Sequence, residues 1–513
     1  MPRLRVALAV GIMLSGASSL AAQVPDIAPD ASAPEASSDE SRSDDPSSDE
    51  EGIDTRLRAL EAREAAREDA LAAALARVAE LEASAVVGAE SFPEESRPEV
   101  EEERGPTLRP LASLVTRFEH REGYDALGAS GPGCLPGDSD CVRYRARAGF
   151  ETTPLRVGEG IRAAVRFLPQ VAGYWALPAF ALAPAPDGPS TSGGVFDPTL
   201  GLHEGVLTLR LGEAARVELG RFEMSYGEHL LIGNLDWHPN ARAFDGGRVR
   251  VQPDEGGIWV DAFWTLITEG GLADFAGGDR SFYGVYAGLG PALGGDVELD
   301  AYALGLQTND APDPSGELRE WSLVVTLGGR VRGRVDQVDL RLEAGFQTGR
   351  RGDVRPADPA LVLAGQVDGE VGLNLLGDRL RLSLEAAWAS GDDPSSSPME
   401  GWTQLFPTAH AFLGLSDVMG GRTNVATAVS SVEVKPLPEL QITLDVHGFL
   451  RPRGPGDTFA GAEGDLHLIW KPGAGLRLRA MYALFVPNAG FWAPGGVADP
   501  VHFLEVEVAY LLQ

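Results

Sequence analysis

Apolar and polar residues alternate along much of the chain, and the clearest case is Asp378–Asp392, DRLRLSLEAAWASGD. Between its ends, Arg379, Arg381, Ser383 and Glu385 fall on one parity. The other parity holds Leu380, Leu382, Leu384, Ala386 and Trp388. Such alternation over about ten residues predicts a β-strand with one apolar and one polar face. Tilted strands of about 9–11 residues span a bilayer in barrel form. Because an arginine facing lipid at mid-membrane costs about 2–4 kcal/mol, we expect Arg379 and Arg381 to face inward.

The same unit recurs to the end of the chain, and short turns alternate with long segments between the units. This alternation is typical of the periplasmic turns and extracellular loops of bacterial outer-membrane barrels, which have an even number of strands. The pattern therefore predicts an all-β fold, a transmembrane antiparallel β-barrel of about 18 strands closed by Val501–Leu512. The predicted strands are Leu111–Arg121, Cys141–Glu151, Glu159–Leu168, His203–Leu211, Arg216–Phe222, Gly247–Gln252, Gly257–Leu266, Ser281–Leu289, Asp296–Leu306, Leu318–Arg332, Val335–Gln347, Leu363–Asn374, Arg379–Ala389, Thr423–Lys435, Glu439–Gly448, Ala460–Lys471, Gly475–Phe485 and Val501–Leu512.

The chain before the barrel reads as an exported extension. Residues 1–22 have two arginines, a short apolar run and small residues, which predict a secretory signal peptide. Residues 23–52 are acidic and are expected to be disordered, and residues 86–107 form an acidic linker. Between them, residues 53–85 carry a heptad pattern that predicts a short coiled coil, with a single solvated helix as the alternative. The barrel then takes residues 108–513.

Charge and motif content narrow the functional classes. The net charge of −32 argues against a nucleic-acid partner. Cys134 and Cys141 lie close together in an exported chain, so a disulfide between them is expected. The sequence has no nucleophile-elbow, zinc-protease or phosphate-loop motif, so we predict neither an enzyme nor a cofactor. No metal site is predicted, because Asp392, Asp393 and Asp417 lack the ligand spacing of a calcium loop.

Two blocks of sequence resemble a known family. Gly220–Arg250 has a strand ending in Gly-Arg, a Tyr-Gly turn, a stretch with Trp and then Arg-x-Phe-Asp-Gly. Ala389–Asn424 follows with Ser-Gly-Asp, Phe-Pro, His410 and Asp417 in order. Both blocks resemble the alginate-export outer-membrane proteins, and the likeness extends in outline over Leu108–Gln513. The resemblance implies an eighteen-stranded monomeric barrel that passively exports an anionic polysaccharide. It also draws attention to Arg221, Asp245, Asp392 and Asp417 as rim residues, with a loop-fixing ion pair as the alternative for the first two.

The parity of the strands places rows of arginines in the lumen, where guanidinium groups suit carboxylates. Many carboxylates are expected on the same inward face, among them Glu119, Asp261, Glu505 and Glu507. The arginines therefore form either a path for anions or a lattice of ion pairs that stiffens the wall. The candidate path residues are Arg143, Arg145, Arg147, Arg162, Arg166, Arg210, Arg248, Arg250, Arg341, Arg379, Arg381, Arg477 and Arg479.

The sequence thus predicts a channel of the bacterial outer membrane with its N-terminal extension in the periplasm. The expected partners are outer-membrane lipid and an anionic, alginate-like polysaccharide or small anions. One alternative is a general or anion-selective porin that oligomerises through residues 53–85, a tail that resembles the trimeric phosphate-selective porins. A second is a structural protein whose coil tethers a periplasmic or cell-wall partner.

Overall fold

The computed structural model describes residues 107–127, 137–175, 199–238, 240–254, 256–268, 279–290, 297–309, 311–312, 318–319, 321–352, 360–393, 395–454, 456–493 and 496–512. The predicted signal peptide, acidic segment, helix or coiled coil, and linker up to residue 106 lie outside these ranges, as does Cys134. No helix in the described residues is long and apolar enough to cross a membrane.

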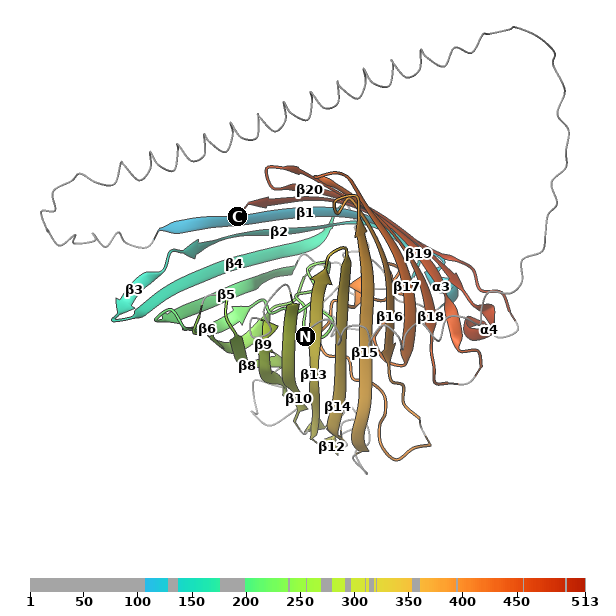
Figure 1. Ribbon diagram of the computed structural model, residues 1–513, viewed down its shortest axis with the longest axis horizontal. Coiled ribbons are helices and arrows are strands. Elements are labelled where there is room, and N and C mark those ends of the chain that lie inside the picture. Colours follow the sequence, from blue (N-terminus) through green and yellow to red (C-terminus); the bar gives the residue numbers. More distant parts are fainter. Residues whose placement is uncertain are drawn as a thin grey trace, which may run out of the picture. The chain divides into compact units, whose positions relative to one another are not determined.

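The described chain is almost entirely β-structure (Figure 1). Its helical segments are three single turns, α3 (Tyr124–Leu127), η3 (Ala409–Ala411) and α4 (Ala489–Trp492). The strands are β1 (Leu108–Glu122), β2 (Ser139–Thr152), β3 (Leu155–Gly158), β4 (Ile161–Trp175), β5 (Thr199–Leu211), β6 (Ala215–Phe222), β7 (Phe244–Val251), β8 (Trp259–Thr268), β9 (Arg280–Gly288), β10 (Val297–Thr308), β11 (Ala311–Pro312), β12 (Leu318–Arg319), β13 (Ser322–Val335), β14 (Val338–Arg351), β15 (Ala360–Leu375), β16 (Leu380–Ala389), β17 (Val425–Leu437), β18 (Leu440–Leu450), β19 (Phe459–Gly473), β20 (Leu476–Pro487) and β21 (Val501–Leu512).

Each strand of the wall pairs antiparallel with its neighbours in the chain, and the last strand returns to the first. The β1–β21 ladder runs from Ala112 opposite Leu512 to Glu122 opposite His502, which closes the barrel. The main sheet in the described residues has nineteen strands. Because β2 and β3 both pair with β4, one after the other along its length, they occupy one strand position. The wall therefore has eighteen strand positions, as predicted.

The alternating pattern separates two faces as expected. In β16, Leu382, Leu384 and Trp388 are exposed on the outer, lipid-facing side. Ser383 on the opposite parity is buried, and Arg381 pairs with carboxylates inside. All eighteen predicted strands are present, with ends that shift by a few residues in most of them. The closed set of paired strands lets every backbone N–H and C=O in the bilayer form its hydrogen bond within the wall.

The largest boundary error falls at β4, which was expected to end at Leu168 but continues to Trp175. The strand passes through Pro169, which lacks the N–H needed for an ordinary ladder bond. The register shifts between Leu168 and Pro169, so the proline sits where the ladder is already irregular. A proline at a bulge therefore interrupts the pattern in the sequence but does not end the strand.

Two long connections behave differently from the expected extracellular loops, because they fold into the barrel. We call residues 223–243 the first inner loop and residues 390–424 the second inner loop. Their apolar side chains, among them Met224, Ile232, Trp402 and Leu413, are buried. They pack with inward-facing aromatic residues of the wall, such as Phe282, into one hydrophobic core. The lumen is therefore partly filled by packed side chains, because burial of this apolar surface favours the inward fold.

Candidate functional site

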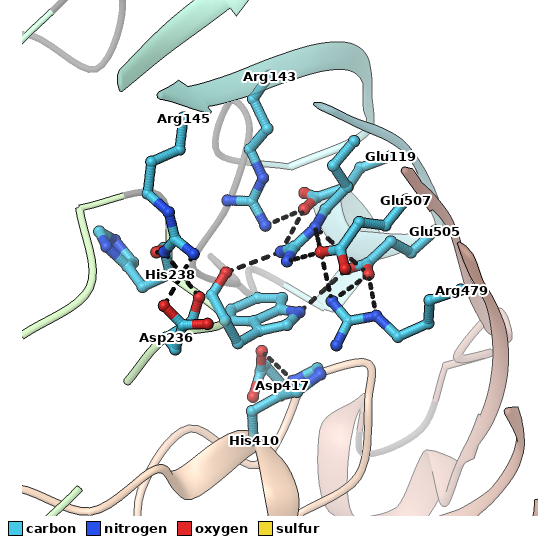
Figure 2. A network of polar contacts seen from close by, with 12 residues as sticks. Glu119, Arg143, Arg145, Asp236, His238, His410, Asp417, Arg479, Glu505 and Glu507 are labelled. Carbon is cyan, nitrogen blue, oxygen red and sulfur yellow. Dashed lines mark hydrogen bonds and ion pairs between the residues drawn. The ribbon is translucent and has the colours of Figure 1, made fainter. Parts of the chain in front are cut away.

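The first inner loop is anchored on the seam where the barrel closes. The indole Nε1 of Trp237 donates to Glu505 of β21 at 3.0 Å. The guanidinium of Arg117 on β1 donates to the Trp237 carbonyl at 2.8 Å and to Glu507 at 2.6 Å. Figure 2 shows this network, in which Arg479 also reaches Glu505 and Glu507, at 2.7 and 2.9 Å. The loop therefore contacts both strands of the seam.

The same loop reaches other parts of the wall through its carboxylates. Glu228 accepts from Nε and Nη2 of Arg330 on β13, at 2.5 and 2.6 Å. Asp236 forms an ion pair with Arg145 on β2 at 2.8 Å. The loop is thus held at three places on the wall by charged side chains, which gives it one defined position.

The second inner loop uses a different set of buried carboxylates. The backbone N–H and the hydroxyl of Ser416 donate to Glu463 of β19, at 2.8 and 2.5 Å. Arg422 donates to Asp368 of β15 at 3.0 Å, and Arg341 shares the same carboxylate at 2.6 Å. Arg422 and Asp368 are almost completely buried, so their pairing is needed to offset the cost of removing both charges from water.

The two inner loops also bind each other. The backbone N–H of Phe406 donates to Leu231 at 2.9 Å, and the N–H of Gly233 donates back to Phe406 at 2.8 Å. The rings of Trp237 and His410 stack with their centroids 4.0 Å apart. Because backbone pairing and ring stacking link the loops, they act as one plug inside the barrel rather than as two independent loops.

Burial and nearby charges shift the pKa of titratable groups in the first inner loop. Burial, together with the positive charges of Arg143, Arg242, Arg117 and Arg145, lowers the pKa of His238 to about 4. Burial alone would raise the pKa of Glu228, but the hydrogen bonds and charge of Arg330 outweigh it and hold the pKa below its usual value. At neutral pH the loop therefore carries a neutral imidazole and an ionised anchor carboxylate.

Most of the predicted path arginines lie in the lumen as one partner of an ion pair. The shortest contact, that of Arg143 with Glu119, joins β2 to β1. The other pairs are Arg145–Asp236, Arg147–Asp236, Arg166–Glu204, Arg248–Glu218, Arg250–Asp261, Arg341–Asp368, Arg381–Asp339, Arg477–Glu507 and Arg479–Glu505, at 2.5–3.4 Å. The lattice of ion pairs that the sequence left as an alternative is thus extensive.

Three of the predicted arginines lie at the short-turn end and are largely exposed. Arg162 approaches Glu213 only at 3.9 Å, and Arg379 lies in the turn before β16. Arg210 lines a cavity of about 590 Å³ together with Arg216 and Glu218. No ion pair involves Arg210 or Arg379 within the described residues. These guanidinium groups are accessible to solutes that enter from the short-turn end.

The residues expected at the rim separate into two places. Arg221 and Asp245 pair at 2.5 Å across β6 and β7, on the same parity as the lipid-facing Leu219. Asp392 and Asp417 belong to the second inner loop, where Asp417 lies 2.9 Å from His410. The described residues contain no group of three or more His, Cys, Asp or Glu side chains that could hold a metal ion. The predicted disulfide of Cys141 stays a prediction, since Cys134 is outside the described ranges.

Comparison with known proteins finds a likeness to one family over part of the chain. Residues 206–457 match the family model described as alginate export. This segment of the chain is similar to the alginate export family. Similar solved structures are OccK1 (OpdK) of Pseudomonas aeruginosa, with 14% identity and a TM-score of 0.53, the BenF-like porin of Pseudomonas fluorescens Pf-5, with 10% and 0.55, and OccK2 (OpdF) of Pseudomonas aeruginosa in complex with glucuronate, with 14% and 0.52. Each covers 79% of this chain and 98% of the other. No curated protein matches the chain significantly.

The structural likeness at these identities establishes the shared barrel fold, and the alginate export match adds the class of protein. The chain is accordingly an outer-membrane β-barrel channel. The matched range 206–457 contains both inner loops in full. The two blocks that carried the resemblance in the sequence are the two segments that form the plug.

Sequence reasoning missed the residues that dock the inner loops. Trp237, Glu228 and Arg242 lie in connections, where strand parity gives no orientation. Asp368 and Glu463 lie on predicted strands, and the alternation in β15 and β19 contained the signal that they face inward. The signal for the plug was the run of apolar residues Leu230, Leu231 and Ile232, which is unusual for an exposed loop.

Proposed function

We propose that this chain is a passive outer-membrane channel for anions that carry uronate groups, in the first place an alginate-like polysaccharide. The observation that carries the proposal is the charge of the 590 Å³ cavity at the short-turn end. Five arginines line it against four glutamates, namely Arg109, Arg166, Arg210, Arg216 and Arg248 against Glu151, Glu204, Glu218 and Glu223. An excess of guanidinium groups in a confined wet space favours anions.

A second cavity at the same end provides an internal comparison. This cavity of about 550 Å³ lies on the β13–β17 side, and its five basic residues are balanced by five acidic ones, namely Arg332, Arg334, Arg341, Arg381 and Lys435 against Glu228, Glu298, Asp339, Glu370 and Glu433. The proposed route for anions therefore follows the β2–β7 side of the lumen. Weak, repeated contacts along such a route let an anion leave as readily as it enters.

The comparisons support the same substrate class. The matched family is described as alginate export, and alginate is a polymer of uronate sugars. OccK2, one of the structurally similar porins, has been solved in complex with glucuronate, a single sugar acid. Both names point to carboxylated sugars, for which bidentate guanidinium contacts are well suited.

The test is the reversal potential of the purified protein in planar bilayers under a salt gradient. Arg210→Gln removes a cavity charge without leaving a carboxylate unpaired, and is expected to shift the potential toward cations. Arg453→Gln serves as the matched control, because Arg453 is exposed in the connection after β18 and pairs with Asp393 away from this cavity. The double variant Arg379→Ala with Arg381→Ala removes positive charge on the β13–β17 side of the lumen, where the basic and acidic residues of the cavity are equal in number. An equal potential for wild type and Arg210→Gln would refute the proposed route.

A porin for small anions is the second candidate, and the plug is the observation that favours it. The inner loops leave cavities of about 430–590 Å³, which suit single small molecules better than a polymer. Block of the current by oligouronate at lower concentration than by glucuronate supports export of a polymer. Equal block by the two supports the porin, and absence of any current supports the structural role.

A further inference from the structure

A third cavity lies next to the arginine-rich one, on the side away from the short turns: His203 and Arg221 line the third cavity, and Glu204 and Phe222 line the arginine-rich one. It has a volume of about 430 Å³ and is lined by both the barrel wall and the first inner loop. The wall contributes Gln170 and His203, and the loop contributes Asn240 and Arg242. Phe244 and Phe406 add apolar surface, the second of them from the second inner loop. Concave sites of about 300–1,000 Å³ with an apolar lining and a few polar groups are typical of small-molecule binding.

Arg242 differs from the lumen arginines described above in its partners. Its Nη1 donates to three backbone carbonyls, those of Gly233, Phe406 and Pro407. No carboxylate pairs with it among the described residues, whereas most of the lumen arginines have one. Burial lowers the pKa of Arg242 to about 10, so the group is still charged at neutral pH. Its Nε and Nη2 have no protein acceptor in the described structure and remain available to a ligand.

The other charges near this cavity are already balanced. Arg221 donates to both carboxylate oxygens of Asp245, at 2.5 and 2.6 Å. Glu223, just beyond the lining, lies 2.6 Å from the Nε2 atom of His203 and accepts from Asn234 at 2.9 Å. Arg147 lies 3.7 Å from Glu223 and balances its charge. The charge of Arg242 therefore has no carboxylate partner among the described residues, and a half-buried cation without a counter-ion favours the binding of an anion.

We propose that this cavity is a binding subsite for one hexuronate unit, with Arg242 as the residue that holds the sugar carboxylate. The subsite rests on the proposed function in that it names where a carboxylated sugar is held on the plug. The guanidinium fork donates from Nε and Nη2 to the two carboxylate oxygens. Asn240 and His203 supply polar groups for the hydroxyls, and Phe244 and Phe406 face the apolar side of the ring.

The location adds a consequence for transport. The carbonyls of Phe406 and Pro407 that accept from Arg242 belong to the second inner loop, so the same guanidinium joins the two loops and faces the cavity. A bound uronate therefore contacts the residue that links both halves of the plug. The proposed subsite therefore holds the substrate where the two loops meet.

The chain offers a matched control in Arg451, just after β18. Its guanidinium also donates only to backbone carbonyls in the described structure, those of Met419 at 2.7 Å and Thr423 at 3.3 Å. Arg451 also ties the second inner loop to the wall, and burial also lowers its pKa. It does not line the 430 Å³ cavity. Replacing it thus tests loss of a loop-tying arginine without loss of the subsite.

The experiment is calorimetric titration of the full-length protein in detergent with glucuronate, and with glucose as the ligand that lacks the carboxylate. We expect glucuronate to bind and glucose to bind at least about tenfold more weakly. Arg242→Gln should weaken glucuronate at least about tenfold, Arg242→Lys should retain part of the affinity, and Arg451→Gln should leave it within about twofold of wild type. Heat-dependent mobility in gels verifies that each barrel is folded.

The outcomes separate the subsite from the channel proposal. Unchanged glucuronate affinity in a folded Arg242→Gln variant, or an equal loss in Arg451→Gln, overturns the subsite. The reversal potential of the Arg210→Gln variant reports on the anion route, because Arg210 lines the arginine-rich cavity and does not line this one. A cation-selective or silent wild-type channel that still binds glucuronate through Arg242 would retain the subsite and refute the route.

Discussion

The ion pair between Glu228 and Arg330 gives the sharpest test that the first inner loop is a docked plug. Glu228→Gln removes the carboxylate charge but keeps the size of the side chain. A fully buried pair costs about 3–5 kcal/mol to break, and an exposed pair about 0–1 kcal/mol. The side chain of Glu228 is 23% exposed, and Arg330 keeps Glu298 at 2.8 Å and Asp300 at 2.9 Å. We therefore expect the docked state to lose about 1–2 kcal/mol.

A loss of that size raises the population of the released loop about 5–30-fold. The assay is single-channel recording, in which released loops appear as more frequent openings of larger conductance. Glu433→Gln is the control. Glu433 lines the 550 Å³ cavity that Glu228 also lines, its side chain is 22% exposed, and it pairs with Lys435 rather than with an inner loop. Indistinguishable recordings from Glu228→Gln, Glu433→Gln and wild type would refute the reasoning.

The pH dependence of the same pair has a defined sign. The pKa of Glu228 is lowered in the folded protein, so its contribution is present above the usual carboxyl pKa of about 4.3. The contribution is lost as the pH falls through the lowered value. The difference between wild type and Glu228→Gln should therefore be full at pH 7 and should disappear in strong acid, in the same recordings.

Three further predictions concern other parts of the chain. Because the pKa of His238 is lowered to about 4, the docked loop should lose stability as the pH falls from about 6.5 toward 4, and His238→Gln should abolish this added release in recordings at pH 7 and pH 5. Asp368→Asn leaves Arg341 and Arg422 without their shared buried carboxylate and should lower the free energy of unfolding in urea by about 3–5 kcal/mol; Asp392→Asn, at a partly exposed site, is the control. Non-reducing mass spectrometry should show Cys134 and Cys141 joined; alkylation of either without reductant would contradict the disulfide.

The barrel could be predicted because the alternation within each strand determines which of its side chains face the lumen. In β16, Leu382 and Leu384 alternate with Arg381 and Ser383. Because successive side chains point to opposite faces, the leucines must share the lipid-facing side and the polar residues the other. The same rule placed Arg143 and Arg248 inward, where the structure has them. The strand count followed because short turns and long connections alternate, and this needs no information from distant residues.

The plug could not be predicted in the same way, because its position depends on contacts between distant segments. Trp237 is 268 residues from its acceptor Glu505, and Arg330 is 102 residues from Glu228. No periodicity relates such pairs, and loop residues carry no parity. Parity also could not distinguish a paired arginine such as Arg381 from one without an ion pair in the described residues, such as Arg210, so the sequence left both the lattice and the anion path open.

We propose that the two inner loops fill the closed barrel and leave an arginine-rich route beside them. The most direct measurement compares wild type with a variant whose residues 224–242 are replaced by a short Gly-Ser linker, in planar bilayers under a salt gradient. We expect a small anion-selective conductance for wild type and a several-fold larger, less selective one for the variant. Equal conductances, or a wild-type channel as large and unselective as the variant, would contradict the account.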